Sequence, residues 1–100
     1  MNTIEYYKVS FGDQNRINGL MQEKNFETWD GAMNYMEGQF KDIIKFLSTR
    51  RAGEDIISDY VRENPFQEQL TYTRQLVVQN KEGFCRIYSG RVEKEWIHLF

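Results

Sequence analysis

The segment TWDGAMNYMEGQFKDIIKFL, from Thr28 to Leu47, decides the fold. Its large apolar residues recur every three or four positions, which places them in one stripe along an α-helix. The stripe consists of Trp29, Met33, Met36, Phe40, Ile43, Ile44 and Leu47, and the opposite side carries Asn34, Glu37, Lys41 and Lys45. Thr28 is a suitable N-cap, and Asp30 follows in the first turn, where the helix dipole favours negative charge. Such a helix must be covered on its apolar side by the flanking segments.

Two glycines interrupt this helix, at positions 31 and 38. Each costs about 1 kcal/mol relative to Ala in a helix interior. Because they are seven residues apart, Gly31 and Gly38 share one side of the helix. Either another element passes close to that side, or the glycines leave a shallow groove for a partner.

The N-terminal segment Thr3–Phe11 alternates in polarity and is rich in aromatic and β-branched residues, which predicts a strand. Turn-forming residues follow at Gly12–Asn15. The segment Arg16–Phe26 has helical spacing of apolar residues but contains Gly19, so a short returning strand is an equal alternative. We favour the strand, which would complete a hairpin with the first one.

After the long helix, Ser48–Gly53 has the basic residues and the glycine of a helix C-terminus. Apolar residues then resume helical spacing within Glu54–Asn64, at Ile56, Ile57, Tyr60 and Val61. This spacing predicts a second, shorter helix that ends before Pro65. Gly53 either separates two helices or bends one, and the polar residues around it favour a break.

From Glu68 to Asn80 the apolar period changes to two, which predicts a long strand. Asn80–Gly83 has the composition of a hairpin turn, Phe84–Ser89 returns as a strand, and Gly90 allows a bulge or corner. Arg91–Phe100 is either a third strand or a final helical turn. The chain is therefore predicted to be one α+β domain, residues 1–100, with an antiparallel sheet made of the N-terminal strand or hairpin and the C-terminal hairpin. This sheet would pack on one long and one shorter helix.

The composition excludes several classes of protein. With 100 residues, 40% apolar residues and 15% aromatic residues, the chain can form one real core and is not disordered. Its net charge of -2 gives no strong attraction for nucleic acid or acidic membranes. The single cysteine indicates a reducing compartment. The N-terminus lacks signal-peptide features and no segment has the length of a membrane span, so a cytoplasmic protein without membrane contact is expected.

No set of residues indicates an active site. Cys85 and His98 are the only cysteine and histidine, and a catalytic pair would need them within hydrogen-bond reach, together with a third positioned group. One Cys and one His do not make a zinc site, and neither a calcium loop nor a glycine-rich phosphate loop is present. We therefore expect no enzymatic activity, no metal and no cofactor.

The segment Lys81–Tyr88 superficially has the basic residue, the glycine and the alternating aromatics of the base-stacking strand in RNA-recognition domains. Arg86 stands where the second stacking aromatic is required, so the pattern does not indicate that family. A basic and aromatic sheet face of Arg74, Arg86, Arg91, Tyr72 and Tyr88 is still an alternative, with nucleic acid as its ligand. The competing interpretation is a solvent-facing sheet with cross-strand charge pairs.

The functional prediction rests on size and on the lack of cofactor motifs. Small acidic domains of this kind, particularly those of phages and mobile elements, commonly act by protein contact as adaptors, inhibitors or antitoxin-like blockers. Aromatic residues and arginine are also the usual anchors of interfaces. The candidate partner-binding residues are Tyr72, Arg74, Arg86, Tyr88 and Trp96, followed by Arg50 and Arg51. The expected partner is another protein, with a homodimer through a sheet edge as a further possibility.

Overall fold

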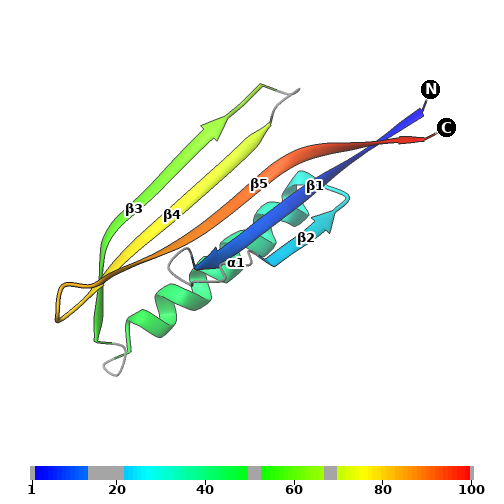
Figure 1. The fold of residues 1–100 in the computed structure, drawn as a ribbon. Coiled ribbons are helices and arrows are strands. Elements are labelled where there is room, and N and C mark those ends of the chain that lie inside the picture. The colour runs from blue at the N-terminus through cyan, green and yellow to red at the C-terminus, as the bar shows by residue number, and fades with distance from the viewer. Residues whose placement is uncertain (1, 14–21, 50–52, 67–69, 100) are drawn as a thin grey trace.

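The computed structural model describes residues 2–13, 22–49, 53–66 and 70–99, which form one helix and a five-stranded antiparallel sheet (Figure 1). The elements are β1 (Asn2–Asp13), β2 (Gln22–Phe26), α1 (Trp29–Leu47), β3 (Glu54–Asn64), β4 (Thr71–Asn80) and β5 (Cys85–Leu99). The strands lie in the order β2-β1-β5-β4-β3. The α+β class and the antiparallel sheet are therefore confirmed.

The first and last strands close the fold. β1 pairs with β5 along its whole length, from Asn2 opposite Leu99 to Asp13 opposite Tyr88. The two ends of the chain consequently lie side by side, and the end of this two-stranded ribbon projects beyond α1 (Figure 1). Segments from both ends of the sequence thus build the centre of the sheet, with β4 and β3 added on one side and β2 on the other.

The helix forms where the apolar stripe predicts it. The Thr28 hydroxyl accepts a hydrogen bond from the Gly31 amide at 3.1 Å, which satisfies one of the unpaired donors at the N-terminus. Met36 and Phe40 are fully buried, and with Ala32 and Leu47 they form the core with five residues of the sheet. These five are Val9, Tyr72, Leu76, Val78 and Val92. We call the covered side of the sheet the helix face and the other side the open face.

Gly90 marks the place where α1 comes closest to the sheet. A Cβ atom at this position would lie 2.7 Å from Phe40 Cε2 and 3.0 Å from Met36 Sδ, closer than packed atoms normally approach. Gly90 continues β5 opposite Phe11 and Arg74, so it forms neither a bulge nor a corner of the chain. The glycine is explained by close packing of the helix.

The predicted shorter helix is wrong. Glu54–Asn64 is the strand β3, which pairs with β4 and carries a register shift between Ile56 and Ser58. The pairs Ile56, Ile57 and Tyr60, Val61 fit helical spacing, but these residues also have high strand propensity, and the irregularity at Ile57 disturbs simple alternation. Since α1 ends at Leu47, Gly53 neither separates nor bends helices.

The remaining strands are confirmed, although β4 begins at Thr71 and β5 at Cys85 rather than at Glu68 and Phe84, and Glu68 itself lies outside the described residues. β2 pairs antiparallel with β1 over Gln22–Phe26, as the hairpin interpretation requires, while positions 16–21 lie outside the described residues. The last segment is a strand as far as Leu99. The Asn80–Gly83 turn is closed by the Gly83 amide donating to the Asn80 carbonyl, with Gly83 at a φ of 91°. Gly12 and Asp13 belong to β1 rather than to a turn.

Candidate functional site

A groove runs between α1 and the outer half of the sheet. It encloses about 500 Å³ and is lined by Asn34, Glu37, Gly38, Lys41, Ile44 and Arg74. Apart from the backbone of the helix itself and the two adjacent residues, no described atom lies within 4 Å of the position that a Cβ would occupy on Gly38, so this glycine faces open space. Gly31 differs, because its Cβ would lie 3.0 Å from the Thr28 hydroxyl oxygen. The neighbour from another element at Gly31 is Phe26 on β2, at the ordinary contact distance of 3.6 Å, because Thr28 is the N-cap of α1 itself; Gly38 fits the groove interpretation.

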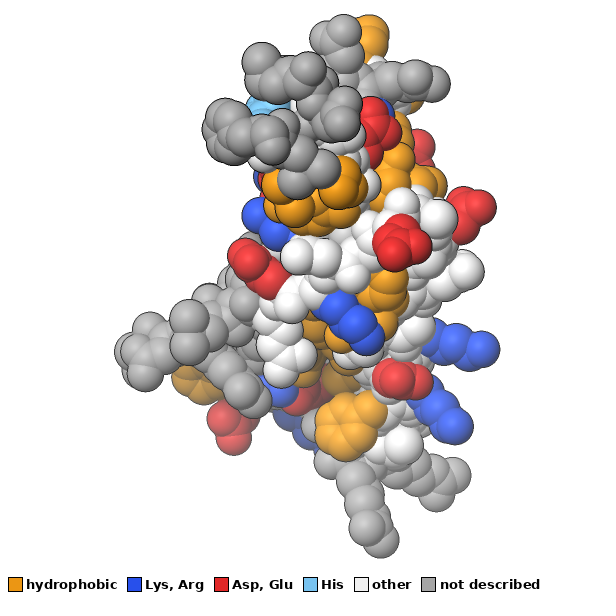
Figure 2. All heavy atoms as spheres, turned by 90° about the vertical axis from the view of Figure 1, so that its right-hand side faces the viewer, with side chains coloured by type: hydrophobic (Ala, Val, Ile, Leu, Met, Phe, Trp, Pro, Cys, Tyr) orange, Lys and Arg blue, Asp and Glu red, His pale blue; other side chains and the backbone are white. Residues whose placement is uncertain are grey.

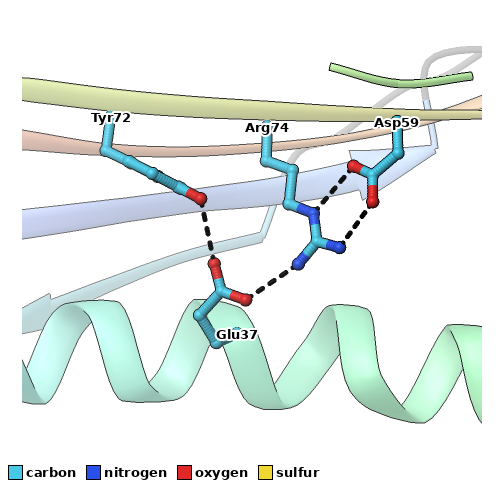
Figure 3. Close-up of polar contacts among 4 residues, drawn as sticks. All are labelled: Glu37, Asp59, Tyr72 and Arg74. Atoms are coloured by element: carbon cyan, nitrogen blue, oxygen red, sulfur yellow. Dashed lines mark hydrogen bonds and ion pairs between the residues drawn. The ribbon is translucent and has the colours of Figure 1, made fainter. Parts of the chain in front are cut away.

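Arg74 forms the wall of this groove and joins three elements (Figure 3). Its Nη1 lies 2.8 Å from Glu37 Oε2 on α1, and its Nε and Nη2 donate to Asp59 on β3 at 3.0 and 2.7 Å. The Tyr72 hydroxyl donates to the other Glu37 oxygen at 3.1 Å. The guanidinium also lies 4.8 Å from the centre of the Phe40 ring. Arg74 therefore has a structural role, because it holds β3 and α1 to the sheet.

The protonation states follow from these contacts. The hydrogen bond from Arg74 lowers the pKa of Asp59, and the bond to Asp59 raises the pKa of Arg74. Burial, followed by the nearby Glu37 carboxylate, raises the pKa of Tyr72. At neutral pH, Arg74 and Asp59 are both charged and Tyr72 is a neutral donor. The cluster is an ion-pair network with a phenol that joins α1, β3 and β4.

Beside the groove, β3 forms an exposed edge of the sheet. It pairs with β4 on one side, and no described strand lies on its other side. Its large apolar side chains, which are Ile56, Ile57, Tyr60 and Val61, are between 42% and 55% exposed. By register, Ile56 and Val61 lie on the helix face, while Tyr60 lies on the open face. An exposed strand of this length and polarity is a template for pairing with another chain.

The sheet residues predicted to bind a partner lie on one face, but that face is the one that α1 partly covers. Cross-strand pairing places Tyr72, Arg74, Arg86, Tyr88 and Trp96 on the helix face. Tyr72 is buried, and the Arg74 side chain is only 14% exposed. Both are occupied by contacts within the protein. Arg91 lies on the open face, so the alternative set of three arginines and two tyrosines does not form a single surface.

The other predicted residues lie at the two ends of the sheet. Arg86 is exposed, donates to the Tyr88 hydroxyl at 3.1 Å and lies 3.6 Å from Glu54 at the start of β3. Trp96 is 39% exposed on the projecting ribbon, where its Nε1 lies 3.4 Å from Glu5. Arg50 and Arg51 lie outside the described residues. The binding role of all these residues stays a prediction.

The candidate catalytic pair is not brought together. Cys85 and His98 lie near opposite ends of β5 and point to opposite faces of the sheet. At about 3.3 Å per residue they are about 40 Å apart. Within residues 2–13, 22–49, 53–66 and 70–99, no group of three or more His, Cys, Asp or Glu residues is arranged to hold a metal ion. Over the same part of the chain, no helix combines the length and apolar character needed to cross a membrane.

The charges of the surface are mixed. Figure 2 shows acidic and basic side chains interspersed on the side that faces right in Figure 1, with hydrophobic side chains exposed between them. This side therefore has no field of a single sign. Comparison of the chain with protein-family models, curated proteins and solved structures gave no match.

Sequence reasoning missed Glu37, Asp59 and the exposed face of β3. Glu37 was placed on the wet side of the helix, and Asp59 and the apolar residues of β3 were placed in a helix. A usable signal was the segment DIISDYV, Asp55–Val61, which is rich in β-branched and aromatic residues. If it had been assigned to a strand next to β4, Asp59 would have become a natural cross-strand partner for Arg74.

Proposed function

We propose that this protein is a small non-enzymatic protein-binding module that uses β3 and the adjoining groove as its contact surface. The observation that carries the proposal is the exposure of β3 along its length, with four large apolar side chains in contact with solvent. Burying such side chains is favourable by about 25 cal/mol per Å² of apolar surface. The outer backbone groups of the strand add hydrogen bonds to an incoming chain.

The occupant we propose is an extended segment of another protein. β3 carries four carboxylates, on Glu54, Asp55, Asp59 and Glu63, and one guanidinium, on Arg62. Arg74 pairs with Asp59, and Arg86 lies 3.6 Å from Glu54, so the acidic character of this edge comes mainly from Asp55 and Glu63. A second copy would bring a strand of the same acidic character against this edge, and like charges placed opposite each other are destabilising. A segment with apolar residues flanked by Lys or Arg complements this edge better. The proposed partner is therefore a different protein, and a homodimer is the weaker alternative.

The groove gives the contact a second component. A segment paired with β3 would direct alternate side chains to the helix face, toward the space lined by Gly38, Lys41 and Ile44. Such a contact is non-covalent and involves no reaction of the partner, so it suits an adaptor, an inhibitor or an antitoxin-like blocker. The same placement disfavours a nucleic-acid interface built on Tyr72 and Arg74, since neither presents a free ring or guanidinium for stacking.

The proposal is tested by capture from cells that encode the protein. The full chain would be compared with the double variant Ile57→Lys, Val61→Lys and with the matched control Ile97→Lys, which adds charge at an exposed apolar position outside β3. We expect the wild type and the control to recover the same stoichiometric protein, and the double variant to lose it. Circular dichroism would check that all three chains fold. Equal recovery by the double variant, or no partner with the wild type, would contradict the proposal.

A further inference from the structure

On the open face, three neighbouring strands place a threonine between two arginines, one on each side. Arg62 on β3 lies opposite Thr73 on β4, and Thr73 lies opposite Arg91 on β5. With strands about 4.8 Å apart, the Cα atoms of the two arginines are about 10 Å apart. Asn64 and Thr71, paired in the next row, complete a hollow of about 230 Å³. We call these five residues the open-face hollow.

Each side chain of the open-face hollow can donate a hydrogen bond. Within the described part of the chain, the side chain of Arg62 forms no ion pair or hydrogen bond. Arg91 uses its Nε toward Glu93, at 3.3 Å, which leaves its terminal amino groups available. The Asn64 Oδ1 accepts from the Phe66 amide at 3.2 Å, so its amide nitrogen remains as a donor. Thr71 and Thr73 add two hydroxyls.

The nearest carboxylate, Glu93, offsets the charge of Arg91 but not that of Arg62. Glu93 lies opposite Thr71 on the same face but does not line the hollow. It is bound from its other side by Lys8, whose Nζ lies 3.3 Å from Oε1. Lys8 and Arg91 together compensate its charge and that of Glu95, which lies 3.8 Å from Lys8. Among the residues that the structure describes, no carboxylate forms an ion pair with Arg62.

We propose that the open-face hollow binds a phosphate monoester group. Two guanidiniums facing each other across neutral donors present more hydrogen bonds than the two oxygens of a carboxylate accept, and they match an oxyanion with three terminal oxygens. A monoester carries a charge of -1.5 to -2 near pH 7, whereas a phosphodiester offers two terminal oxygens and a single charge. The open-face hollow lies on the open face, whereas the proposed contact uses the backbone edge of β3 and the groove on the helix face; Arg62 contributes charge to both.

The test is a titration of the full chain with different anions. Binding is monitored through the amide chemical shifts in NMR spectra. Inorganic phosphate, O-phosphoserine and dimethyl phosphate are added separately at constant ionic strength, with chloride as the reference anion. Inorganic phosphate and O-phosphoserine should give saturable shifts centred on Arg62, Thr73 and Arg91. Dimethyl phosphate should bind at least fivefold more weakly.

Variants separate a built site from general charge attraction. Arg62→Gln and Arg91→Gln should each weaken O-phosphoserine binding at least fivefold, and Thr73→Val should weaken it less. Lys45→Gln removes the same charge from the exposed side of α1 and should leave binding unchanged. Shifts equal to those with chloride, or equal losses in Arg62→Gln and Lys45→Gln, would overturn the site. Equal affinity for dimethyl phosphate would overturn its assignment to a monoester.

Discussion

Arg74 and Asp59 meet in a two-point contact between neighbouring strands, with Nε 3.0 Å from Oδ1 and Nη2 2.7 Å from Oδ2. Such paired contacts are the strongest geometry of an Arg–carboxylate bond. β3 has few other buried contacts, since its side chains are largely exposed. Together with the backbone pairing to β4, this contact holds the strand on which the proposed binding surface depends.

Asp59→Asn should loosen β3 more than it destabilises the whole protein. The Asp59 side chain is partly exposed, so solvent screens the pair and the expected loss is about 0.5 to 1 kcal/mol in the free energy of unfolding. Chemical denaturation measures this loss, and amide hydrogen exchange should become faster in β3 than in β1. Asp42→Asn, on the exposed side of α1, is the control and should change neither measurement.

Stability should depend on the ionisation of Asp59 in acid. The hydrogen bond from Arg74 lowers the pKa of this carboxyl below its unfolded value of about 4. The stabilisation by the pair is therefore fully present above about pH 4 and is lost as the pH falls through the lowered pKa of the folded state. Urea denaturation of the wild type should show a steeper loss of stability below pH 4 than denaturation of Asp59→Asn. Parallel curves would contradict this assignment.

Gly90→Ala should destabilise the protein by about 1 to 3 kcal/mol, the usual cost of overpacking a core. The added methyl group would lie 2.7 Å from Phe40 and 3.0 Å from Met36, both fully buried. Gly38→Ala is the matched variant, because position 38 lies within α1 and its added methyl group would point into open space. It should stabilise the protein by up to about 1 kcal/mol, as Ala replaces Gly in a helix. A melting temperature that shifted in the same direction in both variants would refute the packing explanation.

Met36→Ala should cost about 2 to 5 kcal/mol in the free energy of unfolding, because it leaves a cavity under the helix. Met36 is fully buried, whereas Met33, one turn earlier, is only partly buried against the core. Met33→Ala should therefore cost clearly less. The comparison by chemical denaturation tests which side of α1 faces the sheet, and equal losses would count against the described packing.

The local patterns of the sequence were sufficient for much of this fold. The apolar stripe from Trp29 to Leu47 fits only the helical period, and Thr28 marks its N-cap. The helix α1 has these bounds and this cap. Alternation likewise predicted β1 and β4. β3 was missed because its apolar residues fit helical spacing, and the irregularity at Ile57 removes the simple alternation that would have indicated a strand.

The candidate site could be predicted only in part. Alternation placed Tyr72 and Arg74 on one side of a strand, but it could not show that α1 would cover that side. Sequence spacing also contains no information on which strands become neighbours. The meeting of Arg62 with Arg91 across Thr73, and of Glu37 with Arg74, depends on strand order and on where the helix crosses the sheet.

The central claim is that the exposed edge of β3 binds another protein. The most direct measurement is amide hydrogen exchange of the full chain, with and without the protein recovered by capture. We expect the β3 amides of Ile57 to Val61 to exchange at least tenfold more slowly in the complex, with little change in β2 at the opposite edge. Unchanged exchange in β3, with protection confined to other strands, would contradict the account.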